Sequence, residues 1–386
     1  MNAAGTARTN GAQPASMAAF LLYFLRLGTF GFGGPIALAE HMQRDLVEER
    51  GWISKQDYLD GLALAQLAPG PLAAQLAMYL GYVRGGIVGA TMVGVAFVLP
   101  SFLMVLALAA TYVRFGGLHW MQAVFYGIGA AVVAIIARSA AKLGKTVLGK
   151  DKLLWAIFAA LAVSTAITRR EIGWLFVAGG VISLAVKSWP RMRAAKVAPM
   201  LFVWAAPAFV GGQTWQLLLF FGKAGLFVFG SGLAIVPFLH GAVVQQHAWL
   251  NEQQFLDSVA VAMITPGPVV ITVAFIGYLV AGIPGAIAAA AGVFLPVYVV
   301  VVLLGPYYQK FASNVSLRAF VQGVTAAAVG AIAGAVVVIA RGAVRDFATA
   351  AIAIVTLVLL MKWKLPEPAI IAASAIAGLL LYPGYR

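Results

Sequence analysis

The residues best suited to bind an anion occur twice in this chain. Arg26 lies inside an apolar segment, and Lys223 occupies the equivalent place in a second apolar segment, 197 positions later. A cation at the centre of a bilayer costs about 2.5–3.5 kcal/mol even on a lenient insertion scale, so two at equivalent depth need a partner. Snorkelling of both long side chains to the membrane interface is the alternative. We interpret the pair as ligands of an anion with two negative charges.

A Pro-Gly-Pro run follows each cation and should end one helix and start the next. The runs are Pro69-Gly70-Pro71 and Pro266-Gly267-Pro268. Proline fits the first helical position, so the amides of the next three residues in each copy should face the tip unpaired. Such N–H groups, at the positive end of the helix dipole, suit an anion. Gln75 and Thr272, one turn further in, would add side-chain donors.

Glycine-rich breaks interrupt the two segments that hold the cations. The first break contains Gly33, Gly34 and Pro35, and the second contains Gly230, Ser231 and Gly232. A continuous helix facing lipid would not contain such breaks, because the freed backbone groups would lose their partners. Close helix packing is the alternative role for these glycines. We assign both breaks to the substrate site, with Pro35 as a further helix start.

These features belong to a repeat that covers most of each half. Residues 27–71 align without a gap on residues 224–268, and after one deletion the register continues to Gly127 and Gly323. A repeat in an apolar chain, broken by Gly and Pro at matching positions, is typical of secondary transporters with substrate between the repeats. We expect a polar tail (1–16), a first repeat (17–190), a linker with a crossing segment (191–213) and a second repeat (214–386).

Composition predicts an integral membrane protein. Hydrophobic residues make up 62% of the chain and charged residues 10%, against about a quarter charged in soluble domains. Stretches close to the ~20 apolar residues of a span lie at 87–113, 119–141, 153–168, 172–187, 283–308, 319–340, 347–363 and 367–382. The fold class expected is all-α and polytopic, with about four to six membrane segments in each repeat.

A short helix should precede each Pro-Gly-Pro run. Ser54 and Asn251 have the sequence of helix caps, and Pro-Gly-Pro stops each helix after residue 68 or 265. The helices would be roughly 21 Å long, too short for ~30 Å of hydrocarbon. We therefore predict a re-entrant hairpin in each half, with its tip buried.

Loop charges predict that the two repeats are inverted. Loop 40–57 holds Arg44, Arg50 and Lys55, whereas its mate 237–254 holds no Lys or Arg. Loops 138–152 and 187–196 are basic too, and basic loops face the cytoplasm. The net charge of +14 is then a matter of topology and does not indicate a nucleic-acid partner.

The sequence contains no pattern for a catalytic, metal or cofactor site. It has no Cys, and its four His lack metal-ligand spacing. We expect no enzyme activity and transport driven by the membrane potential or an ion gradient. An intramembrane enzyme acting on lipid phosphates and a passive anion channel are the competing classes. Asp60 and Asp257, the carboxylates at matched positions, are candidates for proton coupling or are polar residues on a wet helix face.

Three motifs carry a resemblance to a known family. They are Phe30-Gly31-Phe32-Gly33-Gly34-Pro35, the segment from Trp52-Ile53 to Asp57, and Ala68-Pro69-Gly70-Pro71. They resemble the chromate ion transporter family in its long form with two homologous, inverted domains. The second copy departs from the pattern, so the halves should contribute unequally; its differing residues are Val228, Ser231, Gly232 and Thr265.

The resemblance implies a substrate and a location. It implies chromate export from the bacterial cytoplasm across the inner membrane, with a likeness to the handling of sulfate, because both are tetrahedral dianions. A carrier for sulfate or another tetrahedral oxyanion is the alternative. The partners expected are the oxyanion and membrane lipid, and a homodimer is left open.

Overall fold

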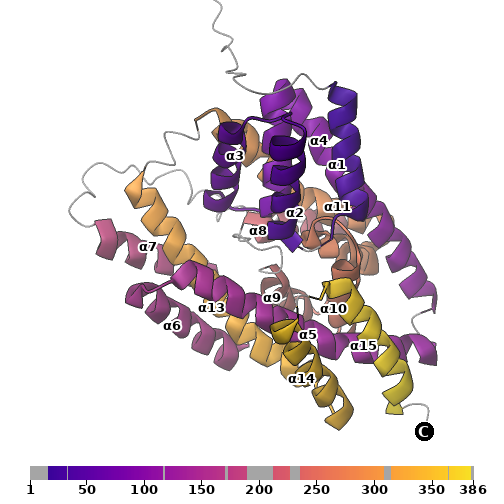
Figure 1. The fold of residues 1–386 in the computed structure, drawn as a ribbon. Coiled ribbons are helices and arrows are strands. Elements are labelled where there is room, and N and C mark those ends of the chain that lie inside the picture. Colours follow the sequence, from indigo (N-terminus) through magenta and orange to yellow (C-terminus); the bar gives the residue numbers. More distant parts are fainter. Residues whose placement is uncertain are drawn as a thin grey trace, which may run out of the picture.

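The computed structural model describes residues 16–32, 34–115, 118–169, 173–188, 212–226, 235–307, 314–363 and 365–383, which form helices and turns without a strand. The first half consists of α1 (Met17–Phe30), α2 (Gly34–Met42), the π-helical turn η1 (Gln43–Glu49), α3 (Lys55–Leu67), α4 (Leu72–Phe115), α5 (His119–Leu148), α6 (Lys152–Thr168) and α7 (Gly173–Ser188) (Figure 1). Gly33, Gly230, Ser231, Gly232 and nearly all of the predicted tail and linker lie outside the described residues.

The second half repeats this order of elements. It consists of α8 (Gln213–Leu226), α9 (Ile235–His240), the π-helical turn η5 (Gly241–Gln246), α10 (Glu252–Ile264), η6 (Val269–Ile271), α11 (Thr272–Leu304), η7 (Gly305–Tyr307), α13 (Val315–Ala343), α14 (Phe347–Lys362) and α15 (Glu367–Leu381). Even the π-helical turn recurs at the matching place. The protein is thus an all-α, polytopic membrane protein with two repeated domains, as the sequence predicts.

The apolar stretches of the sequence form helices within a few residues of the predicted bounds. By length and composition, α4, α5, α13 and the segment Val269–Leu304 could each cross a membrane. One boundary is wrong: residues 138–148, assigned above to a basic loop, continue α5 to Leu148. The helix continues because most residues of this end of α5 are good helix formers, namely Ala, Lys, Leu and Arg, so the basic side chains lie on a rigid element.

Both long helices that follow the Pro-Gly-Pro runs contain a sharp break. In α4 the break is at Gly85 and Gly86, where Gly86 has φ 59° and ψ −146°. The matching break in α11 is at Ala281 and Gly282, where Gly282 has φ 62° and ψ −150°. The close approach of Gly81 and Gly89 shows that the chain folds back at the first break. A Cβ added to Gly81 would lie only 2.5 Å from the carbonyl oxygen of Gly89. The 44 residues of α4 therefore form two antiparallel helices.

The helix α3 and the first part of α4 form the predicted hairpin. The hydroxyl of Ser54 caps α3 by accepting from the Asp57 amide at 3.0 Å. A Cβ at Gly61 in α3 would meet the ring of Tyr79 and lie 3.1 Å from Leu76 Cδ1, so the two arms are antiparallel about the Pro-Gly-Pro tip. In the second half, Asn251 and Gln254 form a complete capping box at the start of α10.

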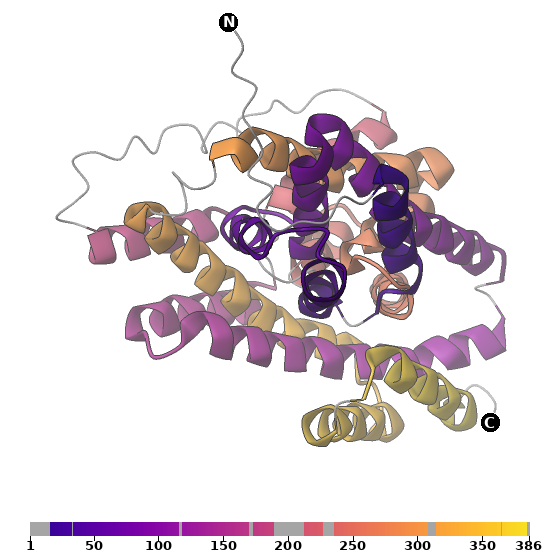
Figure 2. The same cartoon turned by 45° about the horizontal axis from the view of Figure 1, so that its top comes forward.

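The two halves exchange their last two helices. The pair α6 and α7 packs against α13 of the second half, and the pair α14 and α15 packs against α5 of the first half (Figure 2). Glycines at matched positions permit both contacts: Gly323 approaches the backbone of Gly179, and Gly127 approaches the backbone of Ser374 and Gly378. Each half thus supplies the packing surface that completes the other.

Gly127→Ala should lower the stability of the protein, whereas Gly129→Ala should not. A Cβ at Gly127 would overlap the backbone of α15, while the nearest atom to a Cβ at Gly129 is Leu256 Cδ1 at 4.0 Å. Overpacking of this kind typically costs about 1–3 kcal/mol, and alanine itself favours a helix over glycine. The melting temperatures of the two purified variants test this. Equal melting temperatures would contradict the close contact between α5 and α15.

Candidate functional site

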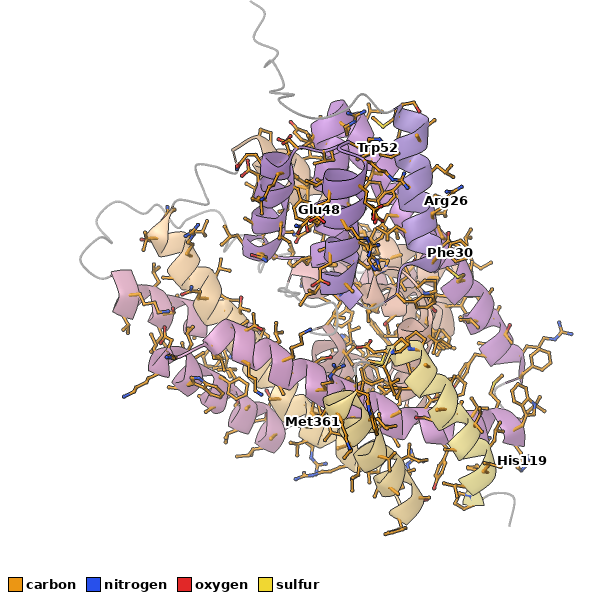
Figure 3. All side chains as sticks on the ribbon, in the orientation of Figure 1. Arg26, Phe30, Glu48, Trp52, His119 and Met361 are labelled. Carbon is orange, nitrogen blue, oxygen red and sulfur yellow. The ribbon has the colours of Figure 1, made fainter. Side chains whose placement is uncertain are left out.

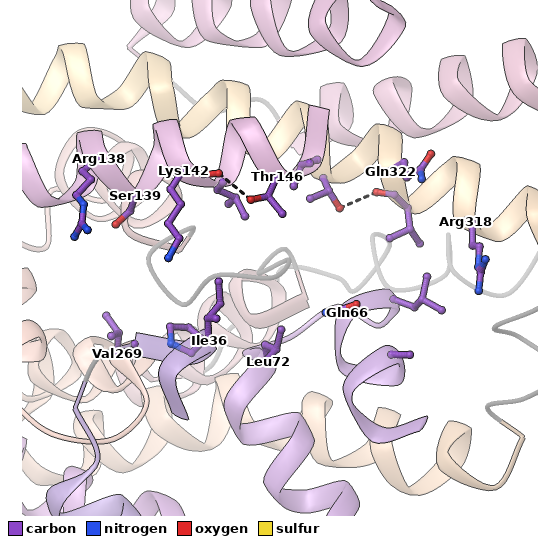
Figure 4. A pocket seen from close by; sticks show the side chains of 18 of the residues that line it. Ile36, Gln66, Leu72, Arg138, Ser139, Lys142, Thr146, Val269, Arg318 and Gln322 are labelled. Carbon is purple, nitrogen blue, oxygen red and sulfur yellow. Dashed lines mark hydrogen bonds between the residues drawn. The ribbon is translucent and has the colours of Figure 1, made fainter. Parts of the chain in front are cut away.

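A cavity of about 580 Å³ lies between the two halves. One wall is formed by α5 and α13, and the opposite wall by α2, α3 and the segments that follow the two Pro-Gly-Pro runs. Figure 4 shows Arg138, Ser139 and Lys142 extending from α5 toward the side that carries Ile36, Leu72 and Val269. The cavity volume is in the range of small-molecule sites.

Three cations line this cavity. Arg138 and Lys142 come from α5, and Arg318 comes from α13. None of the three forms an ion pair within the part of the chain that the structure describes. Glu367 of α15 is the one acid among the described lining residues, so three cations against one carboxylate leave two positive charges. A cavity with this excess charge attracts anions.

Three helix starts also reach the cavity. The residues concerned are Gly34 at the start of α2, Leu72 at the start of α4 and Val269 at the start of η6. Amides at helix starts lack partners in the same helix and carry the positive end of the dipole. The cavity therefore combines helix starts with cationic side chains, two kinds of group that bind oxyanions.

The prolines of the two tips cap the helices and are not their first residues. The Gln75 amide donates to the Pro71 carbonyl at 3.0 Å, and the Ile271 amide donates to the Pro268 carbonyl at 2.9 Å. The second start is a tight 3₁₀ turn that uses the Ile271 amide, which was predicted to be unpaired. The second copy thus offers fewer backbone donors than the first, in line with the expected inequality.

Each Pro-Gly-Pro tip packs against the other half. The Gly267 amide donates to the Gly31 carbonyl at 2.8 Å, and a Cβ at Gly70 would lie 2.9 Å from Val297 Cγ2. Pro71, Gly70 and all of Pro266-Gly267-Pro268 are buried, and Pro69 is half-buried. The tips are therefore contacts between the halves, and the residues directly after them line the cavity.

The two polar side chains behind the tips bond to the tips themselves. Gln75 Nε2 donates to the Pro69 carbonyl at 2.7 Å, and Thr272 Oγ1 donates to the Val269 carbonyl at 2.8 Å. Both residues are buried. Their observed bonds stabilise the tips and the helix starts.

Arg26 and Lys223 are not among the residues that line the cavity. Both side chains are exposed, and Figure 3 shows Arg26 on the outer face of α1, away from the helices that pack against it. Of the predicted substrate residues in the described chain, Gly34 and Pro35 lie at the cavity. A role for Arg26 and Lys223 in substrate binding stays a prediction from the sequence.

The two matched aspartates occupy different environments. Asp257 is only 3% exposed and accepts from Tyr112 of the first half at 2.7 Å and from Gln253 at 2.8 Å. Asp60 is half-buried and accepts from Gln56 at 2.8 Å. Neither lines the cavity. A coupling role for either residue stays a prediction, and only Asp257 connects the two halves.

The cavity cations were missed as site residues because basic residues near a helix end were interpreted as topology signals. The repeat contains a signal that could have identified them. Gly334 and Val338 stand in the second copy where Arg138 and Lys142 stand in the first. Basic residues that only set the membrane topology can lie on any face of a helix. Arg138 and Lys142 are four residues apart and share one face, which indicates a common role.

A multi-pass helical protein with two repeats around one cationic cavity belongs to the class of membrane transporters. The chain is a member of the chromate transporter family, whose profile matches residues 18–184 and 215–379, one match in each repeat.

Curated relatives cover nearly the whole chain. A chromate transport protein of Cupriavidus metallidurans is 59% identical over 99% of this chain and 96% of its own length. A probable chromate transport protein of Synechococcus elongatus is 54% identical over 93% of this chain and 94% of its own length. A chromate transport protein of Pseudomonas aeruginosa is 32% identical over 96% of this chain and 94% of its own length. No solved structure is a significant match.

Proposed function

We propose that the protein exports chromate from the bacterial cytoplasm across the inner membrane by alternating access, driven by the membrane potential or an ion gradient. The observation that carries the proposal is the cavity lined by three helix starts and by three cations that form no ion pair with a described residue. Chromate is a tetrahedral dianion, and its charge equals the excess positive charge of the lining. The names of the relatives support chromate among such dianions.

The lining residues suggest how a dianion would be held. Arg138 and Arg318 present planar guanidinium groups that bind two oxygens of an oxyanion at once, while Lys142 acts as a mobile point charge. Ser139 and the helix-start residues Leu72 and Gly34 line the same cavity. Sulfate has the same charge and a similar shape, so a sulfate carrier is the second candidate.

The position of the cations supports a cavity that opens to the cytoplasm. Arg138 and Lys142 lie in the last turns of α5, directly before the basic residues Lys145, Lys150 and Lys152. Such clusters face the cytoplasm by the positive-inside rule. An oxyanion could then enter this cavity from the side on which it must be captured for export.

A small cavity at the position related by the repeat supports alternating access. It has a volume of about 20 Å³. Four of its lining residues match residues of the large cavity at an offset of 196: Phe125, Tyr126, Gly129 and Ala343 correspond to Val321, Gln322, Thr325 and Val147. A cycle that opens the small cavity and closes the large one would present the substrate to the other side.

Residues that line the small cavity form one hydrogen bond between the halves and one within the second half. Tyr126 donates to Asp346 at 2.5 Å, and Arg345 donates to Gln253 at 3.2 Å. Gln322, the residue of the large cavity that corresponds to Tyr126, also forms a hydrogen bond between the halves, because it accepts from Lys187 at 2.9 Å. In the proposed cycle the bonds of Tyr126 and Arg345 would break when the small cavity opens.

Bacteria that produce the protein should accumulate less chromium from added chromate than cells with an empty vector. In inverted membrane vesicles the cytoplasmic face is outside, so excess sulfate in the medium should slow chromate uptake if both ions use one site. Uphill chromate movement in these vesicles separates a carrier from a channel. Higher accumulation in the producing cells would overturn the export direction, and unchanged accumulation together with no vesicle flux would overturn chromate as substrate.

A further inference from the structure

A carboxylate faces the cations of the large cavity. Glu367 is the first residue of α15, between Pro366, which caps the helix, and Pro368. The α15 helix packs against α5, which carries Arg138 and Lys142. The amides of Ala369 and Ile370 bond to the Pro366 carbonyl at 3.0 and 3.3 Å, so the first turn is well formed. The position of Glu367 at the cavity is therefore fixed by a rigid helix start.

Glu367 is the group in this cavity whose charge can change. Arg138 and Lys142 lie on α5, the helix against which α15 packs, whereas Figure 4 shows Arg318 of α13 at the opposite end of the cavity from Arg138, and no described His or second acid lines the cavity. Arginine and lysine keep their charge over the physiological pH range. Glu367 forms no ion pair within 4 Å with any described cation. Glu367 thus lines the same cavity as the cations, and no described ion pair holds its carboxylate in the charged form.

The charge state of Glu367 must change the affinity for a dianion. When it is ionised, the carboxylate repels an incoming oxyanion and offsets part of the charge of the cations. When it is protonated, it leaves Arg138 and Lys142 to the oxyanion and adds an O–H donor. Two sites that interact in this way are linked, so each ligand raises the affinity for the other.

We propose that Glu367 couples oxyanion binding to proton binding, so that a proton enters the cavity with the dianion. This inference rests on the proposed function, because it uses the same cavity. It goes further by naming the coupled ion and the residue that carries it. The protonated complex moves one negative charge fewer per cycle than the dianion alone.

The test is the pH dependence of radiolabelled sulfate binding to the purified full-length protein. Sulfate is the probe because it stays a dianion from mildly acidic to mildly alkaline pH, whereas chromate itself gains a proton there. The wild-type affinity should fall as pH rises, by at most about tenfold per pH unit for one linked proton. Glu367→Gln should remove this dependence and bind sulfate about fivefold or more tightly at alkaline pH.

Two further variants control for changes in structure. Glu367→Asp keeps a titrating carboxylate and should restore the pH dependence. Glu49→Gln removes an acid whose side chain is 60% exposed on η1 and absent from the cavity lining, and should behave as wild type. Melting temperatures of all variants show whether the helix start is intact.

The outcomes separate this inference from the proposed function. If Lys142→Gln weakens sulfate binding but Glu367→Gln keeps the wild-type pH dependence, the proton coupling is overturned and the cavity stands. If neither variant changes sulfate binding, the cavity is not the oxyanion site, and both proposals are overturned. Loss of the pH dependence in Glu367→Gln, with its return in Glu367→Asp, supports the inference.

Discussion

Arg138→Gln and Lys142→Gln should each reduce oxyanion transport about 10- to 100-fold, because a hydrogen bond to a charged group contributes about 1.5–3 kcal/mol. Both side chains line the cavity from α5 without an ion-pair partner in the described chain. Neither side chain has an ion pair to lose within the described chain, so the variants should reach the membrane in normal amounts. The measurement is chromium accumulation, normalised to the amount of protein in the membrane.

Lys145→Gln is the matched control for this prediction. Lys145 lies on the same helix, is exposed and does not line the cavity, so its loss should leave transport near the wild-type rate. Arg26→Gln and Lys223→Gln should reduce transport less than Lys142→Gln, because both side chains are exposed away from the cavity lining. The reverse order of effects would assign the substrate to the pair that the sequence singled out.

Gly267→Ala should abolish transport and destabilise the protein by about 3 kcal/mol, the sum of backbone strain and overpacking. The residue has φ 94°, which favours glycine, and a Cβ would overlap Ser101 Oγ and lie 3.2 Å from the Gly28 carbonyl oxygen. The displaced tip would lose the bond from its amide to Gly31. Because the tip precedes Val269 at the cavity, the helix start would move with it.

Gly149→Ala separates strain from overlap. Gly149 has φ 49° and no atom within 4 Å of an added Cβ, so this variant has the strain without the overlap. It should retain transport and lose less stability than Gly267→Ala in thermal unfolding of the purified proteins. Similar losses in both variants would show that the contact of the tip with Ser101 is unimportant.

Local patterns predicted the helical elements because their causes are local. Ser54 and Asn251 cap helices at the predicted residues, and Pro-Gly-Pro ends α3 and α10. The break at Gly85 and Gly86 falls directly before the apolar span predicted from residue 87, but the antiparallel packing of the two helices on either side of it was not predicted. Its cause is the close packing of Gly81 on Gly89, a contact between chain segments that no helical periodicity reveals.

The candidate site was predicted in its backbone parts and missed in its charged parts. Gly34 and Pro35 were identified because glycine and proline have local conformational meaning, and they line the cavity. Arg138, Lys142 and Arg318 line one cavity only because α5 packs against α13, a contact between distant parts of the chain that local patterns do not predict. The apolar context of Arg26 drew attention to it, yet the structure places its side chain on an exposed face.

The exchange of the last two helices between the halves affects biogenesis. When the ribosome has completed α7, Ser183 still lacks the Ala319 carbonyl to which it bonds at 2.7 Å, and Gly179 lacks its neighbour on α13. Until α13 is synthesised, the helix surface of the first half that contains Gly179 therefore has no packing partner. A chain that stalls at this point lacks the helices that complete its packing. We expect such a chain to be degraded by membrane quality control and to have no partial transport activity.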